Sequence, residues 1–331
     1  MPRRMPFGIA CLLAALLLVA GCGRPEGAKP PASSAAGSKG TIGVSVLTMT
    51  NPFFKTIADT ITAEAAARGY ETIVTSGEFD VARQQNQVKD FIVGRCAAIV
   101  LCPCDSRSIG PAIQEANAAG IPVFTADIAC LAPEAKVVSH IATDNLGGGR
   151  QAGEAMIEAL APGGGKVLIL DFKQAESCLL RVQGFKEVIT AHNAADPDAA
   201  IEIVAELPGD GQKDQGFRCT EDALQAHAAL AGIFAINDPS ALGARAALEK
   251  AGRAERVKII GFDGQLDGKQ AIREGKIHAD PVQFPERIGQ LTMESILNYL
   301  AGEDIPPQQL IPTDLYRQAD GLADPALDGS P

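Results

Sequence analysis

Short apolar segments alternate with amphipathic segments along most of this chain, and this pattern constrains the fold more than any other feature. Apolar runs of this length are typical of buried strands, and the segments between them have helical periodicity. The predicted strands are 42–47, 71–75, 97–101, 122–125, 137–141, 166–170, 201–205, 232–236, 258–261 and 277–282. The predicted helices are 52–68, 81–93, 108–119, 146–160, 179–191, 214–230, 239–251 and 285–300. Continuous apolar strands alternating with helices indicate βαβ units and parallel sheets that are buried on both faces.

The βαβ unit is repeated too often for one small sheet. Roughly 290 residues follow the N-terminal region, and chains of that size usually divide into two domains. We therefore predict an α/β fold with two doubly wound parallel-sheet lobes. A single α/β barrel has the same alternation and stays open on the pattern alone.

The N-terminal region has the features of an export signal. Two arginines precede a nearly unbroken apolar run at 7–19, which is shorter than the roughly 20 residues that a membrane-spanning helix needs. The run ends in Leu18-Val19-Ala20-Gly21-Cys22, which resembles a bacterial lipobox. An ordinary signal followed by a chance cysteine is the alternative. We predict a lipoprotein signal peptide at 1–21, lipidation of Cys22, a flexible tether at 22–40 and a location in the periplasm or cell envelope.

The chain that remains after signal removal is acidic. It has 29 Lys and Arg, of which two lie in the predicted signal, against 40 Asp and Glu, so the net charge becomes 27 − 40 = −13. Nucleic-acid surfaces need clustered basic residues and often stacking aromatics, whereas this chain has three Tyr and no Trp. We expect no nucleic-acid partner, and contact with a membrane only through the N-terminal lipid.

Cysteines and histidines form no metal-binding pattern in the sequence. The four histidines are far apart, at His140, His192, His227 and His278. Cys102-Pro103-Cys104 lacks the second cysteine pair that a zinc site of this type requires. We expect neither a metal nor a cofactor. An extracytoplasmic location permits disulfides, but the sequence leaves open the pairing of Cys96, Cys102, Cys104, Cys130, Cys178 and Cys219.

Polar residues follow most of the predicted strands at the point where each strand ends. They are Thr50-Asn51, Cys102 to Asp105, Asp127, Asp171, Asn237-Asp238, Asp263 and Gln283. Ligands of open α/β sheets bind at the carboxyl ends of the strands, so these residues are candidates for a binding site. Helix capping is the alternative for Asp105 and for Asn51-Pro52 and Asp238-Pro239, which look like N-caps followed by proline. Asp263 lies between Gly261 and Gly264, and glycines let a backbone approach a ligand closely.

The motifs at these positions resemble the ribose-binding group of periplasmic binding proteins, which shares its fold with the sensor cores of Lac-repressor-type regulators. The resemblance covers about residues 41–317. Its motifs are Asn51-Pro52-Phe53-Phe54, the segment 138–145, Arg181 with Gly184-Phe185, Asn237-Asp238, Gly261-Phe262-Asp263-Gly264 and Gln283. Each motif is a weak signal alone, and their shared order makes the resemblance specific.

The resemblance implies a set of sugar-contacting residues. They are Asn51, Phe53, Phe54, Asp127, Arg181, Asn237, Asp263 and Gln283, with Cys102 at the position of a family asparagine. The residue types suit a sugar, because an aromatic ring packs on its apolar face while carboxylates and amides hydrogen-bond its hydroxyls. The alternatives are core packing for the two phenylalanines and a surface ion pair for Arg181.

Three positions depart from the family pattern. Cys102 replaces an asparagine, Ile128 replaces an arginine, and Gly211 stands where an aromatic residue would cover the second face of the sugar. We therefore expect a small neutral sugar or polyol other than ribose, bulkier and filling the space at Gly211. Binding of such a polyol should be measurable, and binding of ribose weak or absent.

The resemblance also implies a mechanism. The chain would cross between the lobes near 143–145, 283 and 312, forming a three-crossing hinge between an N-terminal lobe (41–143 plus 284–312) and a C-terminal lobe (144–283 plus 313–331). Such a protein is a monomer that closes on its ligand and delivers it to the permease subunits of an ABC importer. A receptor presenting the ligand to a chemoreceptor or sensor kinase is the alternative. We do not expect an enzyme. An enzyme acting on a sugar would need a carboxylate pair or a nucleophile–base pair in the cleft, and the sequence offers only Asp127 with Asp263 as a candidate pair.

Overall fold

The computed structural model describes residues 38–328. The predicted signal peptide, Cys22 and nearly all of the predicted tether lie outside these residues. Among the residues that are described, no helix is long and apolar enough to cross a membrane.

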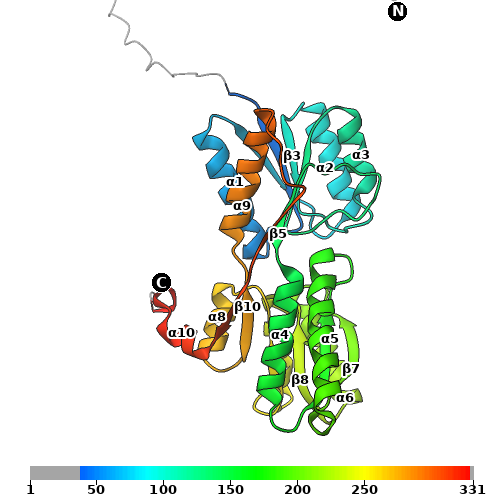
Figure 1. Ribbon diagram of the computed structural model, residues 1–331, viewed down its shortest axis with the longest axis vertical. Coiled ribbons are helices and arrows are strands. Elements are labelled where there is room, and N and C mark those ends of the chain that lie inside the picture. Colours follow the sequence, from blue (N-terminus) through cyan, green and yellow to red (C-terminus); the bar gives the residue numbers. More distant parts are fainter. Residues whose placement is uncertain (1–37, 329–331) are drawn as a thin grey trace, which may run out of the picture. The chain divides into compact units, whose positions relative to one another are not determined.

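The first sheet is built from six parallel strands in the order β11-β5-β4-β3-β1-β2 (Figure 1). Its strands are β1 (Thr41–Val46), β2 (Glu71–Ser76), β3 (Ala98–Leu101), β4 (Val123–Ala126), β5 (His140–Thr143) and β11 (Gln308–Ile311). Its helices are α1 (Pro52–Ala67), α2 (Val81–Val93), α3 (Gly110–Ala118) and α9 (Pro285–Leu300). α1 packs against α9 on one face of the sheet, and α2 packs against α3 on the other.

The second sheet has the order β12-β10-β9-β8-β6-β7, and only its edge strand β12 runs antiparallel to its neighbour within the described chain. Its strands are β6 (Gly165–Asp171), β7 (Ile201–Pro208), β8 (Leu230–Ala235), β9 (Lys258–Ile260), β10 (Ala279–Val282) and β12 (Asp314–Arg317). Its helices are α4 (Asn145–Leu160), α5 (Glu176–Ala195), α6 (Lys213–Ala226), α7 (Asp238–Lys250), α8 (Leu266–Arg273) and α10 (Gln318–Ala323), with short 3-10 helices at Pro197–Ala199 and Pro325–Leu327.

Two doubly wound sheets confirm the predicted α/β fold class and exclude the barrel alternative. The strands β3 and β4 are buried along their length, and β6 is buried over its last five residues, as the continuous apolar runs predicted. The edge strands β11 and β12 were not predicted. β11 alternates between exposed and half-buried residues, and β12 has one exposed residue followed by three half-buried ones. Both strands lie at sheet edges and bury none of their residues fully.

Within residues 38–328, three connections join the two sheets: β5 to α4, β10 to α9, and β11 to β12. Two of them contact each other, because the Thr143 hydroxyl donates to Oε1 of Gln283 at 2.7 Å. The connections therefore bring the carboxyl ends of strands from both sheets to one region, where a cavity is found.

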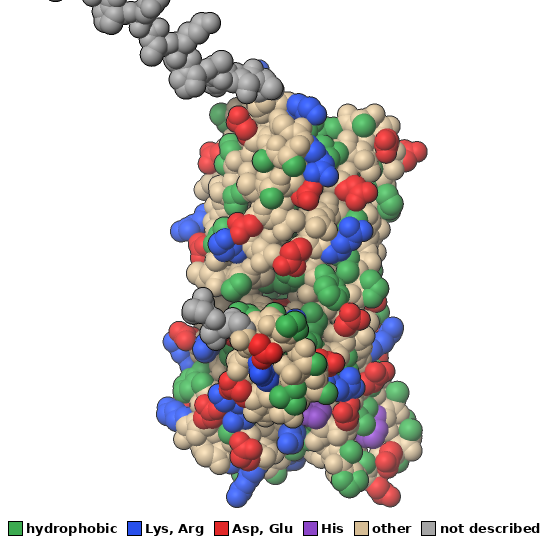
Figure 2. All heavy atoms as spheres, turned by 90° about the vertical axis from the view of Figure 1, so that its left-hand side faces the viewer, with side chains coloured by type: hydrophobic (Ala, Val, Ile, Leu, Met, Phe, Trp, Pro, Cys, Tyr) green, Lys and Arg blue, Asp and Glu red, His purple; other side chains and the backbone are tan. Residues whose placement is uncertain are grey.

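Figure 2 shows acidic and basic side chains interspersed over the visible face of the molecule.

Candidate ligand-binding site

A pocket with an empty volume of about 410 Å³ lies where the strand ends of the two sheets meet. The pocket is lined by Leu47, Asn51, Phe53, Phe54, Phe79, Asp127, Ile128, Phe172, Ala175, Ser177, Cys178, Arg181, Gly211, Ile236, Asn237, Asp263 and Gln283. Eight of the nine residues predicted to contact a ligand are therefore brought together.

Cys102 is the exception among the predicted contacts. It does not line the pocket, and its side chain is completely buried in the hydrophobic core of the first sheet. Its carbonyl oxygen accepts a hydrogen bond of 3.0 Å from Nε2 of Gln84. The structure therefore does not bring Cys102 to the pocket with the other predicted contacts, because Cys102 directly extends the buried strand β3 and its side chain packs inward.

The first turn of α1 places two aromatic rings at the pocket. Oδ1 of Asn51 accepts a 2.9 Å hydrogen bond from the amide of Phe53, and Pro52 begins the helix, so Asn51 caps the helix as well as lining the pocket. The rings of Phe53 and Phe54 meet edge to face at 5.4 Å. Both side chains belong to the buried core and also line the cavity, so core packing and pocket lining are not exclusive here.

The start of α7 differs slightly from the prediction. Asn237, not Asp238, is the N-cap, because its Oδ1 accepts from the amide of Ser240 at 3.0 Å. The Nδ2 of Asn237 donates to the carbonyl of Gly211 at 3.0 Å, which fixes the amide where it lines the pocket. The capping role considered for Asp105 is not observed, because α3 begins at Gly110 with Ile109 as its N-cap. Oδ1 of Asp105 instead accepts from the amides of Arg107 and Ser108 in the turn before that helix.

Arg181 and Asp263 form a buried ion pair in the second sheet's half of the pocket. Nη1 of Arg181 lies 3.2 Å from Oδ1 of Asp263, and both side chains are 4% exposed. The same nitrogen donates to the carbonyl of Ile236 at 2.7 Å, and Nε donates to Asn145 at 2.8 Å. The guanidinium also lies 3.9 Å from the centre of the Phe262 ring. The surface ion pair considered for Arg181 is therefore not observed.

Two glutamines complete the contacts of Asp263. Nε2 of Gln283 donates to its Oδ1 at 2.5 Å, and Nε2 of Gln265 donates to its Oδ2 at 2.9 Å. Burial raises the pKa of Asp263, while the charge of Arg181 and these amide donors oppose the rise. Asp263 has a positive φ of 107°, an unusual conformation for a residue with a side chain, and it turns the carboxyl into this network.

Asp127 is an isolated carboxyl group in the pocket. Its residue is 3% exposed, and Oδ1 has no hydrogen-bond partner among the described residues. The backbone is held in a left-handed conformation, with φ of 64°, and its amide donates to the carbonyl of Ile141. Burial raises the pKa of Asp127 to about 7; the charge of Arg181 opposes the rise, while Asp263 and Glu176 add to it.

Aromatic residues that the sequence analysis missed lie close to Gly211. Phe172 follows β6 and Phe79 follows β2, and their rings meet at 6.1 Å. A Cβ atom on Gly211 would lie 3.9 Å from the Phe172 ring and 3.1 Å from Nδ2 of Asn237. Phe172 and Asn237 therefore adjoin Gly211, which also lines the pocket, and the bulkier sugar expected at this position stays a prediction. The location of Phe172 directly after a strand was the signal that could have identified it.

Hydrogen bonds join the two sides of the pocket directly. Nε2 of Gln265 donates to Oδ1 of Asn51 at 3.0 Å. The amide of Ser106 donates to the carbonyl of Gln174, and the Ser106 hydroxyl accepts from the amide of Glu176, each at 2.9 Å. An open cleft of about 1410 Å³ adjoins the pocket, and its walls include Asn51, Phe79, Gly211 and Gln265. The structure is therefore a closed arrangement in which Gln265 lies between the pocket and this cleft.

A second group of buried carboxyls lies in the same half of the molecule but does not line the pocket. Asp238 and Asp280 are almost completely buried, and both oxygens of Asp280 lack a donor among the described residues. Burial raises the pKa of Asp280 to about 6, and the charge of Asp263 adds to this rise. Burial and repulsion from Asp280 raise the pKa of Asp238 well above its usual value. The pair therefore holds a proton that an unfolded chain would release.

Replacement of Asp280 by asparagine is expected to stabilise the fold at pH 7–8. A raised pKa means that Asp280 contributes stability below its unfolded pKa near 4, and that this stability is lost as the pH rises through about 6. The asparagine does not titrate, so the variant should gain about 1–3 kcal/mol in unfolding free energy at pH 8 and almost nothing at pH 4. Urea unfolding at both pH values measures this, and an equal change at both would contradict it.

Comparisons with known proteins identify the family of this chain. A family model described as a periplasmic binding protein domain matches residues 42–304. The ribose import binding protein RbsB of Escherichia coli is 34% identical over 283 residues, which cover 86% of this chain and 92% of that protein. A D-apiose import binding protein of Paraburkholderia graminis is 32% identical over 271 residues, covering 81% of this chain and 84% of that protein.

A solved structure is similar in fold over most of the chain. It is an ABC transporter solute-binding protein of Mycobacterium smegmatis with bound glycerol, with a TM-score of 0.78 and 30% identity over 87% of this chain and 96% of that one. These matches show that the chain belongs to the periplasmic binding protein family, as the sequence motifs indicated. It is a solute-binding protein of the ABC importer type and not an enzyme, and its family acts in the periplasm.

Proposed function

We propose that this protein captures a neutral sugar or polyol in the pocket between its two lobes and delivers it to the permease subunits of an ABC importer. The observation that carries the proposal is a pocket in which aromatic rings and hydrogen-bonding side chains from the strand ends of both sheets converge. The import of ribose and D-apiose by relatives and the glycerol bound in the similar structure support this class of ligand.

The residue chemistry suits hydroxyl groups. Phe53 and Phe54 offer aromatic surface to the apolar face of a sugar ring. Asp127 and Asp263 accept hydrogen bonds from hydroxyls, whereas Arg181 donates. The remaining predicted contacts are the amides Asn51, Asn237 and Gln283, which both donate and accept.

The lobes would move as two bodies, the first comprising 41–143 plus 284–312 and the second 144–283 plus 313–331. The three connections between the sheets serve as the hinge, and a ligand that touches both lobes stabilises their closed arrangement. We place the protein in the periplasm as a monomer, anchored through a lipid on Cys22. Mass spectrometry of the membrane-extracted protein tests the anchor, and light scattering tests the monomer.

Calorimetric titration with pentoses, hexoses, polyols and amino acids tests the function. We expect at least one neutral sugar or polyol to bind, to be returned unchanged after prolonged incubation, and to bind more tightly than ribose. Ribose is disfavoured because Ile128 offers no donor where the family has an arginine. Binding of amino acids alone, or of none of these compounds by the folded protein, would contradict the proposal.

Removal of the Gln265 side chain is expected to speed ligand release. Gln265 hydrogen-bonds Asn51 across the pocket and Asp263 on its own side, so Gln265→Ala removes the direct contact between the two halves beside the open cleft. Two neutral hydrogen bonds are worth about 1–3 kcal/mol together, so the dissociation rate should rise about 5- to 150-fold. Rapid filtration of the protein loaded with radiolabelled ligand measures this rate. Gln290→Ala, an exposed glutamine on α9, is the matched control, and a change below twofold in Gln265→Ala would exclude the role.

A further inference from the structure

We propose that the ligand of this pocket is a deoxy or C-methyl sugar, or the corresponding polyol, which turns a carbon without a hydroxyl towards an apolar wall and a hydrogen-bond donor towards Asp127. The apolar wall is defined here as Leu47, Ile128, Phe172 and Cys178. The inference rests on the proposed function and narrows the ligand class of the same site.

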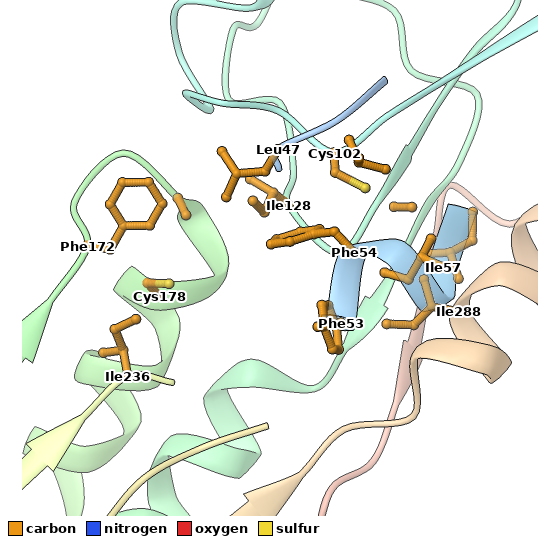
Figure 3. Packing of buried hydrophobic residues seen from close by; sticks show 14 of the residues in the cluster. Leu47, Phe53, Phe54, Ile57, Cys102, Ile128, Phe172, Cys178, Ile236 and Ile288 are labelled. Atoms are coloured by element: carbon orange, nitrogen blue, oxygen red, sulfur yellow. The ribbon is translucent and has the colours of Figure 1, made fainter. Parts of the chain in front are cut away.

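The apolar wall comes from four separate elements of both halves. Leu47 follows β1, Ile128 follows β4, Phe172 follows β6 and Cys178 lies in α5. Figure 3 shows these side chains around one space, with Leu47 and Ile128 together and Phe172 and Cys178 opposite them. All four line the pocket, and none is more than 6% exposed. Their only polar hydrogen is the thiol of Cys178, which is a weak donor.

A sugar hydroxyl placed against this wall would lose its water without gaining a strong partner. Such an unmatched buried hydroxyl lowers affinity by about 5- to 100-fold. A methyl or methylene group at the same place would gain from burial, because the apolar side chains already exclude water. The apolar wall therefore disfavours a ligand that carries a hydroxyl group on the part facing the wall.

The other polar groups of the pocket are already organised in one network. Arg181, Asp263, Gln283 and Gln265 are hydrogen-bonded to one another through Asp263, and Gln265 connects them to Asn51. This network positions the donors and acceptors that recognise the hydroxylated part of the ligand. The four residues of the apolar wall form no such hydrogen-bond network.

Two polar side chains adjoin the apolar wall. Asp127 precedes Ile128, and Ser177 precedes Cys178. The buried Oδ1 of Asp127 lacks a partner among the described residues, so the ligand must bring a donor to it. The combination requires a molecule with one donor beside a carbon that bears no hydroxyl, which is the pattern of a deoxy sugar.

Pairs of sugars that differ by one hydroxyl test this inference on the unaltered protein. Suitable pairs are D-fucose with D-galactose, L-rhamnose with L-mannose, and 2-deoxy-D-ribose with D-ribose, titrated by calorimetry. We expect the deoxy member to bind at least about fivefold more tightly in the pair that fits the pocket. Equal or tighter binding by the hydroxylated member of every pair that binds would overturn the inference and leave the proposed function standing. Failure of every sugar and polyol to bind would overturn both.

A substitution in the apolar wall gives a second readout. Ile128→Thr adds a hydroxyl to the wall and should reduce the preference for the deoxy member at least about threefold, because the parent sugar then finds a partner. Ile128→Val keeps the wall apolar and should leave the preference unchanged. Thermal unfolding shows whether each variant is folded. An unchanged preference in a folded Ile128→Thr protein would count against the inference, and the sugar pairs decide if that variant does not fold.

Discussion

Replacement of Asp263 by alanine is expected to weaken ligand binding at least about 30-fold, which corresponds to about 2 kcal/mol. The carboxyl lines the pocket and is held by Arg181, Gln283 and Gln265. Without it, ligand hydroxyls lose an acceptor, and the guanidinium of Arg181 is left without its counter-charge. Isothermal calorimetry with the ligand found in the titration screen measures the loss.

The same substitution should also lower the stability of the protein, so the binding loss must be measured on folded material. Removing one partner of a buried ion pair costs about 3–5 kcal/mol, because the other charge stays buried. Circular dichroism at the temperature of the titration checks folding, and Asp263→Asn preserves the size and part of the hydrogen bonding. Asp304→Ala, at an exposed position away from the pocket, is the matched control. A change in affinity below threefold in Asp263→Ala would contradict the assignment of Asp263 to the site.

The sequence predicted the central strands and the strand-end residues because both depend on local patterns. A continuous apolar run specifies a strand that is buried on both faces, and the residue after such a strand lies at the sheet edge whatever the remainder of the chain does. Asn51, Asp127 and Asp263 were found in this way. The edge strands β11 and β12 were missed because half-exposed strands of four residues give no such run.

The parts of the site that were not predicted depend on distant contacts. Cys102 follows a strand as Asp127 does, but its side chain packs into the core, and only the three-dimensional packing decides between core and pocket. Gln265 gains its position from Asn51, which is more than 200 residues away in the chain. Phe172 lies beside Gly211 only in the folded chain, because these two residues follow neighbouring strands of the second sheet. Sequence reasoning located the strand ends, and packing selected among their side chains.

Ligand affinity is expected to depend on pH through Asp127. In the free protein its pKa is raised to about 7, chiefly by burial, so the carboxyl is largely protonated below that pH. Hydroxyl donors of the ligand favour the ionised carboxylate, and binding must therefore release a proton at low pH. The dissociation constant should rise as the pH falls below 7, by up to about tenfold per pH unit, and level off above it. Calorimetry in buffers of different ionisation enthalpy detects the released proton directly.

Asp127→Asn should separate binding from stability, with Asp280→Asn as the matched control. Both substitutions turn a buried carboxyl of raised pKa into an amide, and both should stabilise the ligand-free protein at pH 8, because a raised pKa removes stability as the pH rises. Only Asp127 lines the pocket, so only Asp127→Asn should weaken binding, by at least about tenfold at pH 8, and abolish the pH dependence of affinity. If Asp127→Asn stabilises the protein and weakens binding, the buried carboxyl of Asp127 serves ligand binding and not stability. Unaltered affinity and an unaltered pH profile in Asp127→Asn would instead show that the ligand makes no hydrogen bond to this carboxyl. The proposed orientation, with a ligand donor facing Asp127, would then be wrong.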